Sequence, residues 1–516
     1  MKGGFRRNMV WLHTYSGLVL GWLLFTIFLT GTLSYFNPEI TQWMKPELTR
    51  VTDTPNIVNR SLDELHARGQ DASNWLIYLP SERTQDWYIQ WGEGRRNRTR
   101  LNLSVDTLKP DVTTIITPRE TASGNFFRVF HYTLELREYG GRFYAGIAAM
   151  FMLVAVFTGI FTHRRFFRDF FTLRLSKLSK TLTDFHALAG LVSIPFCIMI
   201  CTSGIMVYVI MYMPFSADHY VGGERAVSRI ISPGLESVDD KAPKTIPLKD
   251  FTPVQKQIQS YWPEANPIKR ITFQQPYSEA GRIIVERIKD QTISRQSERL
   301  VFSSHSGKLL ESYPQASTAA NVRQVFWGLH EAHFADLGLR WLLFWLGLIS
   351  TALIATGSII WLNKRLERVK TKHLGHKIVE RLNVAVIAGL PLAIAAFFIS
   401  NRLLPVGLEN RADAEVQVFL WVWLACLIHS VLRPTSKAWV EQLLLTAIGC
   451  FMVPVIDLYQ DSNRLINGVV QFNTSYVGFA LVLLVVGAVL AKTALWLRAR
   501  SVTPLSSNKA VKYHAN

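Results

Sequence analysis

Four histidines occupy matching positions in two weakly similar halves of the 516-residue sequence. His13 in WLHTYSG and His186 in DFHALAG each begin a His-x-x-x-Gly segment, and each precedes a second glycine by 18 residues. His131 in RVFHYTL and His330 in WGLHEAH lie 27 and 26 residues before the threonines of FTGIF and ATGSII. An internal repeat with this spacing predicts that the histidines face one another in two pairs across a pseudo-two-fold axis.

Paired imidazoles on opposing helices are the axial ligands that a b-type haem needs, one on each face of the macrocycle. We expect His13 to pair with His186 and His131 with His330, which predicts two haem b groups whose iron is bound by these side chains. A lone histidine at a helix end is commonly an ordinary interfacial residue, but four at repeat-related positions favour ligands. No CxxCH segment occurs, so covalent c-type haem is excluded.

Two other histidines stay open as alternative ligands, His163 in FTHRRFFRD and His333 in HEAHF. His163 has no repeat-related mate, because Trp361 falls opposite it in the alignment of the two halves. Basic residues near the predicted sites could neutralise haem propionates. These are Arg7, Arg164, Arg165, Arg128 and Arg142. The aromatic residues that could pack on a porphyrin are Trp11, Tyr15, Phe185, Phe127, Phe130 and Trp327.

Eight apolar runs can be interpreted as membrane helices, which need about 20 residues to cross a bilayer. They cover residues 9–36, 143–163, 185–213, 341–362, 382–400, 416–432, 442–456 and 465–491. The seventh is the shortest and contains Pro454. The expected fold is therefore a membrane all-α helical bundle, in which the unit helix, external domain, helix occurs twice with the same orientation before four further helices.

The net charge of +18 is concentrated in alternate short segments between these runs. Residues 1–8, 164–181, 363–381, 430–441 and 492–516 carry +3, +5, +5, +1 and +5. An excess of Lys and Arg in short loops is typical of the cytoplasmic side of a membrane. We therefore expect both termini, including the tail at 492–516, in the cytoplasm, and we expect lipid rather than nucleic acid as the partner of this charge.

Two long and nearly neutral segments, residues 37–139 and 214–339, should lie on the other side of the membrane as α+β domains. Short strand patterns such as NWLIYLP and GRIIVERI alternate there with turn residues. The four cysteines all lie in apolar runs, so no external disulfide framework is expected. An aromatic and cationic surface for docking a substrate could be formed by Trp75, Trp87, Trp91 and Arg96.

Five segments of the chain resemble the PepSY-associated transmembrane helix family, which includes bacterial iron-regulated membrane proteins and ferric siderophore reductases. They are WLHTYSGLVLGWLLF, FFRVFHYTLELREYGGRFYAG, TGIFTHRRFFRDFFTLR, DFHALAGLVSIPF and GLHEAHFADLGLRWLLFWLGL. The resemblance covers roughly residues 5–368, and the last four helices resemble only longer members. It implies PepSY-like folds for the two external segments, which would be periplasmic, and a bacterial inner-membrane location. The family's histidines fall on His13, His131, His163, His186 and His330.

The expected function is an oxidoreductase that carries electrons through two haems and reduces ferric iron, bound in a siderophore or another chelate, in the periplasm. Reduction would release the iron, because hard oxygen chelators hold Fe³⁺ far better than Fe²⁺. No GxGxxG or P-loop occurs, so we expect the electron donor to be a quinol or a cytoplasmic reductase. One alternative is a metal or siderophore permease without redox chemistry. Another is a set of external binding or protease-inhibitory modules that the helices merely anchor.

Overall fold

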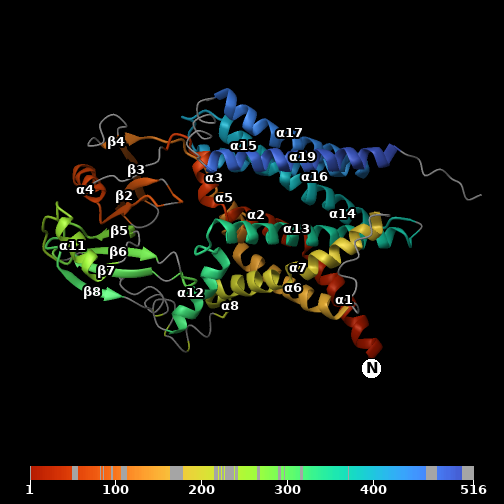
Figure 1. Cartoon of the computed structure of the whole chain (residues 1–516), viewed down its shortest axis with the longest axis horizontal. Helices are drawn as coiled ribbons and strands as arrows, with labels where there is room; N and C mark the ends of the chain where they lie inside the picture. Colours follow the sequence, from red (N-terminus) through yellow and green to blue (C-terminus); the bar gives the residue numbers. More distant parts are fainter. Residues whose placement is uncertain are drawn as a thin grey trace, which may run out of the picture.

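In the computed structural model, a bundle of long helices carries an antiparallel sheet at one end (Figure 1). The structure describes residues 2–48, 56–81, 83–84, 86–93, 97–105, 113–162, 178–213, 219, 222, 226, 238, 242–263, 268–288, 292–295, 297–313, 318–369, 371–460 and 474–502. We call the end of the bundle next to the sheet its sheet side, and the other end its distal side.

The long helices of the repeated part are α1 (Lys2–Val19), α2 (Gly21–Ser34), α6 (Gly141–Thr162), α7 (Leu178–Val207) and α13 (Leu337–Leu366). Short helices on the sheet side are α3 (Asn37–Met44), α5 (Asn125–Thr133), α8 (Val209–Tyr212) and α12 (Thr318–Glu331). The C-terminal part consists of α14 (Leu374–Asn383), the π-helical turn η1 (Val384–Ala388), α15 (Gly389–Leu403), α16 (Arg411–Leu432), α17 (Thr435–Gln460) and α19 (Thr474–Val502). The internal repeat appears in the packing, because α1 packs on α6 and α2 on α5, as α7 packs on α13 and on α12.

Within the described part of the chain, seven helices are long and apolar enough to cross a membrane, and the bent pair α1–α2 would add an eighth. The expected multi-pass membrane protein of mostly helical structure is thereby confirmed. Helices α1 and α2 meet at an angle of 64°. The bend falls at Leu20, between Gly17 and Gly21, and glycine is the residue with the poorest helix propensity apart from proline.

Several helices extend beyond the expected spans. Helix α7 begins at Leu178 and includes Lys180, whereas the run was expected to begin at residue 185. Helix α17 covers Thr435–Gln460 with Pro454 inside it, because neighbouring helices and local adjustments can compensate for proline within a membrane helix. Helix α19 continues to Val502, so the first part of the expected tail is helical.

Eight strands form one sheet in the order β4-β3-β2-β1-β5-β6-β7-β8, with every neighbouring pair antiparallel. The first half consists of α4 (Ile57–Arg68), β1 (Asn74–Tyr78), β2 (Trp87–Glu93), β3 (Asn97–Val105) and β4 (Thr113–Ile116). The second consists of α11 (Thr252–Tyr261), β5 (Ile268–Gln274), β6 (Arg282–Ile288), β7 (Ser297–Ser303) and β8 (Leu309–Tyr313). The halves join where β1 pairs with β5, with Leu76 opposite Thr272. The segments 37–139 and 214–339 therefore share one sheet, which the sequence did not predict.

Two of the aromatic residues proposed as a docking surface, Trp75 and Trp87, belong to the core of this sheet, so the prediction was wrong for these two. Trp75 and Trp87 are 0% and 1% exposed. Their indole N–H groups donate to the carbonyl of Gly69 at 2.7 Å and to the hydroxyl of Ser61 at 2.9 Å, which places both rings under α4. Trp91 is partly buried against the same cluster, and Arg96 lies outside the described residues.

The opposite face of the sheet carries the polar side chains of the same strands. Tyr78 and Tyr88 stack there with ring centroids 4.3 Å apart. Glu286 pairs with Arg270 and, at 2.8 Å, with Arg299. Burial alone would raise the pKa of the Glu286 carboxyl, but the two guanidinium groups outweigh burial and lower it. This carboxylate therefore stays ionised at neutral pH and holds β5, β6 and β7 together through their side chains.

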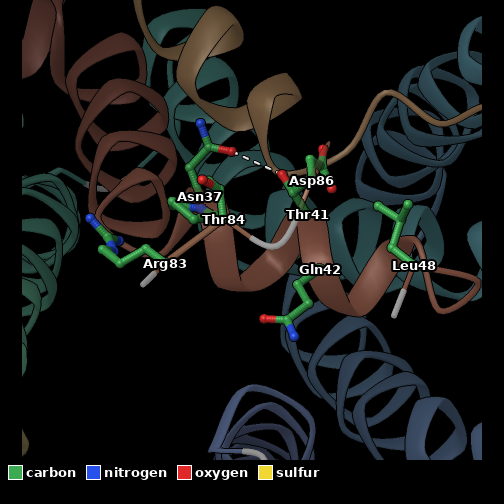
Figure 2. A pocket seen from close by; sticks show the side chains of 8 residues that line it. Asn37, Thr41, Gln42, Leu48, Arg83, Thr84 and Asp86 are labelled. Atoms are coloured by element: carbon green, nitrogen blue, oxygen red, sulfur yellow. Dashed lines mark hydrogen bonds between the residues drawn. The ribbon is translucent and has the colours of Figure 1, made fainter. Parts of the chain in front are cut away.

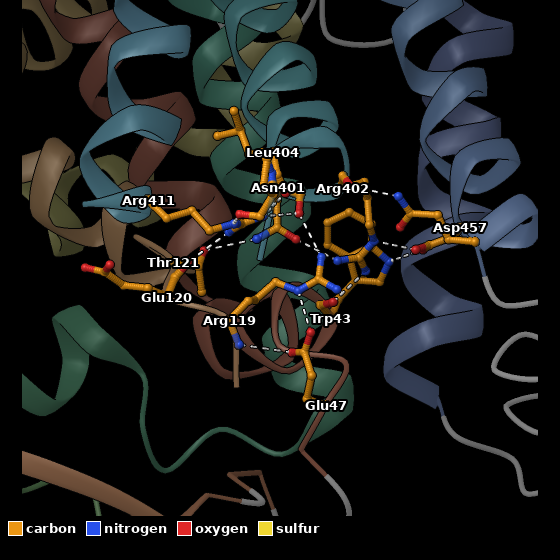
Figure 3. Close-up of polar contacts among 12 residues, drawn as sticks. Trp43, Glu47, Arg119, Glu120, Thr121, Asn401, Arg402, Leu404, Arg411 and Asp457 are labelled. Atoms are coloured by element: carbon orange, nitrogen blue, oxygen red, sulfur yellow. Dashed lines mark hydrogen bonds and ion pairs between the residues drawn. The ribbon is translucent and has the colours of Figure 1, made fainter. Parts of the chain in front are cut away.

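A buried cluster of charged side chains attaches the C-terminal helices to the rest of the bundle on the sheet side (Figure 3). Arg411 and Glu415 of α16 are both fully buried and pair at 2.6 Å. The second carboxylate oxygen of Glu415 accepts hydrogen bonds from the Thr121 hydroxyl at 2.6 Å and from the Ala122 N–H at 3.0 Å. The Glu415 carboxylate therefore joins α16 to the segment that leads into α5.

A second part of the cluster centres on Arg402 of α15, whose side chain is fully buried. Its guanidinium pairs with Asp457 of α17 and lies 3.7 Å from the ring centroid of Trp43 in α3. The Trp43 indole N–H donates to the same carboxylate at 2.7 Å. Helices α3, α15 and α17 are thus linked through one ion pair and one aromatic ring.

Candidate functional site

The structure places the four repeat-related histidines in two facing pairs. His13 of α1 and His186 of α7 meet with ring centroids 6.4 Å apart and ring planes at 71°. His131 of α5 and His330 of α12 meet at 5.9 Å and 37°. In each pair, one ring comes from each half of the repeat, as the spacing predicted. We call them the distal pair and the sheet-side pair.

The spacing of both pairs fits one metal ion held between two imidazoles. Two metal–nitrogen bonds of about 2 Å on opposite sides of one ion place the ring centroids roughly 6.3 Å apart. The observed separations of 6.4 and 5.9 Å lie close to this value. The described residues include no group of three or more His, Cys, Asp or Glu side chains placed to hold a metal ion.

The Nδ1 atom of every paired histidine forms a hydrogen bond with a main-chain carbonyl of a neighbouring helix. His13 contacts Ala155 O at 2.8 Å and His131 contacts Ile27 O at 2.8 Å. The same contact joins His186 to Leu353 O at 3.1 Å and His330 to Ile200 O at 3.0 Å. Because a carbonyl oxygen can only accept, Nδ1 must carry the hydrogen, and Nε2 keeps its lone pair. This is how proteins orient a histidine that ligates a metal.

Each of the four accepting carbonyls lies just before a Ser-Gly or Thr-Gly pair. A serine or threonine follows it three residues later and a glycine four residues later; the pairs are Thr30–Gly31, Thr158–Gly159, Ser203–Gly204 and Thr356–Gly357. The hydroxyls of Thr158 and Thr356 donate to the carbonyls of Ala155 and Leu353, at 3.2 and 3.0 Å. The Thr-Gly pairs could be seen in the sequence, but their position next to the carbonyls that contact the histidines could not.

The glycines of these Ser/Thr-Gly pairs leave room for the imidazole rings. A Cβ at Gly31 would lie 2.6 Å from Nδ1 of His131, and one at Gly204 would lie 3.0 Å from the ring of His330. At the distal pair, a Cβ at Gly159 would come within 3.2 Å of His13. A side chain at any of these positions would therefore crowd or move a ring.

Burial keeps the sheet-side pair neutral. It lowers the pKa of His330 to about 3, with the nearby His131 adding to the effect, and it lowers the pKa of His131 as well. Helix α5 ends two residues after His131 and α12 ends one residue after His330, and each is followed by a left-handed residue, Leu134 at φ +55° and Ala332 at φ +50°. Such backbone costs of order 1–3 kcal/mol per residue and is typical of sites where position matters more than stability.

The two pairs lie at different depths of the same helices. On α7, fourteen residues separate His186 of the distal pair from Ile200, which holds the sheet-side pair. An equal spacing of fourteen residues separates His13 on α1 from Ile27 on α2. At a rise of 1.5 Å per residue this spacing amounts to about 21 Å along α7. The pairs therefore stand one above the other along the long axis of the bundle.

Within the described part of the chain, the alternative histidine ligands and the arginines predicted near the propionates are not part of either histidine pair. His333 lies three residues beyond His330, near Phe334 and Gly328, and is not part of either pair. His163, Arg164 and Arg165 lie outside the described residues. Arg7 is exposed on α1, Arg128 donates to Asn125 at 2.6 Å, and Arg142 lies 5.6 Å from the ring of Tyr132. Their role toward propionates stays a prediction.

Two of the aromatic residues expected on a porphyrin pack elsewhere. Phe127 and Phe130 are 0% and 2% exposed and belong to a cluster with the C-terminal helices. Phe127 contacts Phe397 and Phe398 of α15, and Phe130 contacts Phe419 of α16. These two rings therefore pack α5 against the C-terminal helices.

A small pocket lies at the junction between the bundle and the sheet (Figure 2). Its volume is about 140 Å³, and it is lined by Asn37, Pro38, Thr41, Gln42, Leu48, Arg83, Thr84 and Asp86. Thr41 also accepts a hydrogen bond from the N–H of Gly124, directly before α5. Sites for drug-sized ligands have volumes of roughly 300–1,000 Å³, so the pocket is too small for a whole chelate.

A family model was found to match most of the chain, whereas no curated protein matches it. The model describes the PepSY-associated TM region and covers residues 10–364. That range contains both histidine pairs, the four Ser/Thr-Gly pairs that follow their carbonyl partners, and the whole sheet. The C-terminal helices α14 to α19 follow it. The chain therefore belongs to the PepSY-associated transmembrane region family.

Proposed function

We propose that this protein is a di-haem b oxidoreductase of the bacterial inner membrane that reduces ferric iron, held in a siderophore or another chelate, on its sheet side. The carrying observation is the geometry of the two histidine pairs, whose spacing and Nδ1 partners suit axial ligands. Haem bound there supplies one-electron transfer. The four histidines would bind and orient it, and the surrounding apolar helices would exclude water.

The orientation of the protein in the membrane is part of this proposal. The net positive segments 1–8 and 363–381 lie next to the distal ends of α1 and α13, which is consistent with a cytoplasmic distal side. The sheet would then be periplasmic. Electrons would enter near the distal pair and leave near the sheet-side pair, where an incoming Fe³⁺ takes up one electron and becomes Fe²⁺, a weaker partner for hard oxygen ligands.

An absorption spectrum of the purified protein tests this proposal. We expect a Soret band, an α band that sharpens on addition of dithionite, and two haem groups per chain by pyridine haemochrome assay. Ferric chelate added to the reduced protein should reoxidise it. A protein without these bands, and unchanged by dithionite, would eliminate the redox function and favour the permease.

The Gly31→Ala variant should lose the sheet-side haem although it leaves every ligand in place. The added methyl group would lie 2.6 Å from Nδ1 of His131, so the ring must move out of its seat. Haem content should fall from two groups per chain toward one. Gly17→Ala is the matched control, because nothing lies within 4 Å of a Cβ at Gly17. Equal haem content in both variants would show that the space left by Gly31 beside His131 is not needed for haem binding.

A further inference from the structure

Three buried polar atoms that make no hydrogen bond within the described part of the chain lie along one seam between α13 and α14. They are Nε1 of Trp361, Nδ1 of His376 and Nδ2 of Asn383. The rings of Trp361 and His376 are 6.0 Å apart, and Asn383 contacts Ser358 one turn along α13. Since nearly all buried polar atoms in proteins have a partner, three along one seam indicate a site for a polar ligand.

The orientation of the Asn383 amide is fixed by two donors. Asn383 is 2% exposed, and its Oδ1 accepts from the Trp22 indole at 2.9 Å and from the Ser358 hydroxyl at 2.5 Å. An indole N–H can only donate, so the oxygen must face Trp22 and the NH₂ group must face away from it. Asn383 therefore offers a buried donor at the corner where α2, α13 and α14 meet.

The seam lies beside the distal histidine pair. Ser358 directly follows Gly357, where a Cβ would lie 3.1 Å from the ring of His186. The π-helical turn η1 begins at Val384, directly after Asn383, and such turns occur frequently at functional sites. The seam is formed with a C-terminal helix that lies outside the repeat, so it can serve a purpose that the symmetric histidine pairs do not.

We propose that this seam binds the head group of a membrane quinol that donates electrons to the distal pair. Trp361 lies one turn along α13 from Ser358, which contacts the Asn383 amide, so both unpartnered donors lie on the same stretch of the seam. Nε1 of Trp361 and Nδ2 of Asn383 can then donate to the two ring oxygens. Leu374 and Ile378 of α14 are 73% and 48% exposed, which provides an apolar surface for the isoprenoid tail.

The reaction balances with the proposed function, on which this inference rests. One quinol gives up two electrons and two protons and becomes a quinone. Two ferric ions on the sheet side each take one electron and become ferrous. The two protons leave to water on the distal side, past the partly exposed ring of His376.

The Trp361→Phe variant provides the sharpest test, because it removes an N–H that has no partner in the described residues and so breaks no internal hydrogen bond. Reduction of the haem bands of detergent-purified protein by decylubiquinol should slow at least tenfold, while reduction by dithionite stays unchanged. Binding of decylubiquinone should raise the melting temperature of the parent protein, and the variant should lose this shift. Asn383→Leu should behave in the same way.

The control is Trp345→Phe, a change on the lipid-facing side of α13, where Trp345 is 54% exposed. It should keep the parent rate with decylubiquinol. A parent protein that dithionite reduces but decylubiquinol neither reduces nor stabilises would overturn the quinol site and leave the reductase proposal standing. Unchanged quinol kinetics in Trp361→Phe and Asn383→Leu would also overturn it, and would assign the seam to ordered water.

Discussion

A His330→Ala variant is expected to purify with one haem group per chain where the parent protein holds two. His330 faces His131 at 5.9 Å, and its Nδ1 is held by Ile200 O and by the Ser203 hydroxyl, both at 3.0 Å. With the ring removed, one axial position has no ligand, and His131 alone must retain the haem. Second-shell changes at metal sites typically cost 10–100-fold in affinity, and losing a ligand itself should cost more. Pyridine haemochrome assay per mole of protein measures the outcome.

The other three histidines extend this experiment. His131→Ala should remove the same haem as His330→Ala, so the double variant should hold one group and not zero. His13→Ala and His186→Ala should each remove the distal haem. His305→Ala, an exposed residue of the sheet, is the matched control and should keep both groups. Two haem groups in His330→Ala would refute the sheet-side pair, and two in His186→Ala would redirect the distal assignment to His163.

The Glu415→Ala variant should lose about 3–5 kcal/mol of stability, the usual cost of removing one partner of a buried ion pair. The change leaves the fully buried guanidinium of Arg411 without its carboxylate. It also removes the acceptor of the Thr121 hydroxyl and of the Ala122 N–H. Thermal unfolding of the protein in detergent, followed by circular dichroism, measures the loss as a lower melting temperature.

Two companion variants separate charge from helix effects in this experiment. Asp413→Ala changes an exposed carboxylate on the first turn of the same helix and should shift stability by no more than about 0.5 kcal/mol. Glu415→Gln keeps an acceptor oxygen but not the charge. Its loss of stability should therefore fall between those of Asp413→Ala and Glu415→Ala. Equal melting temperatures for Glu415→Ala and Asp413→Ala would mean that the buried cluster does not hold the C-terminal helices.

The histidine partners and the membrane helices could be predicted from sequence because both leave simple periodic traces. An apolar run of sufficient length has few alternatives to a membrane helix. The repeat placed His13 and His186 at equivalent positions, and symmetry then brings equivalent residues together across the axis. The family match over residues 10–364 confirms the resemblance of the five quoted segments.

The sheet and the buried charges could not be predicted in this way. Pairing of β1 with β5 joins residues about two hundred positions apart, and no local pattern encodes such a contact. Trp75 and Trp87 looked like surface residues because strand alternation alone does not say which face a helix will cover. Arg402, Arg411 and Glu415 lie at the ends of apolar runs, where charged residues usually reach water, so their burial depends on neighbours that only the fold reveals.

The strand order β4-β3-β2-β1-β5-β6-β7-β8 shows that the sheet consists of two similar halves. Each half is a helix followed by a four-stranded meander, and the halves meet through their first strands, antiparallel, as a two-fold axis requires. This is the isologous contact of a homodimer, here present within one polypeptide. A half chain produced alone would expose that strand as an open edge and would be prone to aggregate. The β1–β5 junction thus has the form of a dimer interface contained within one chain.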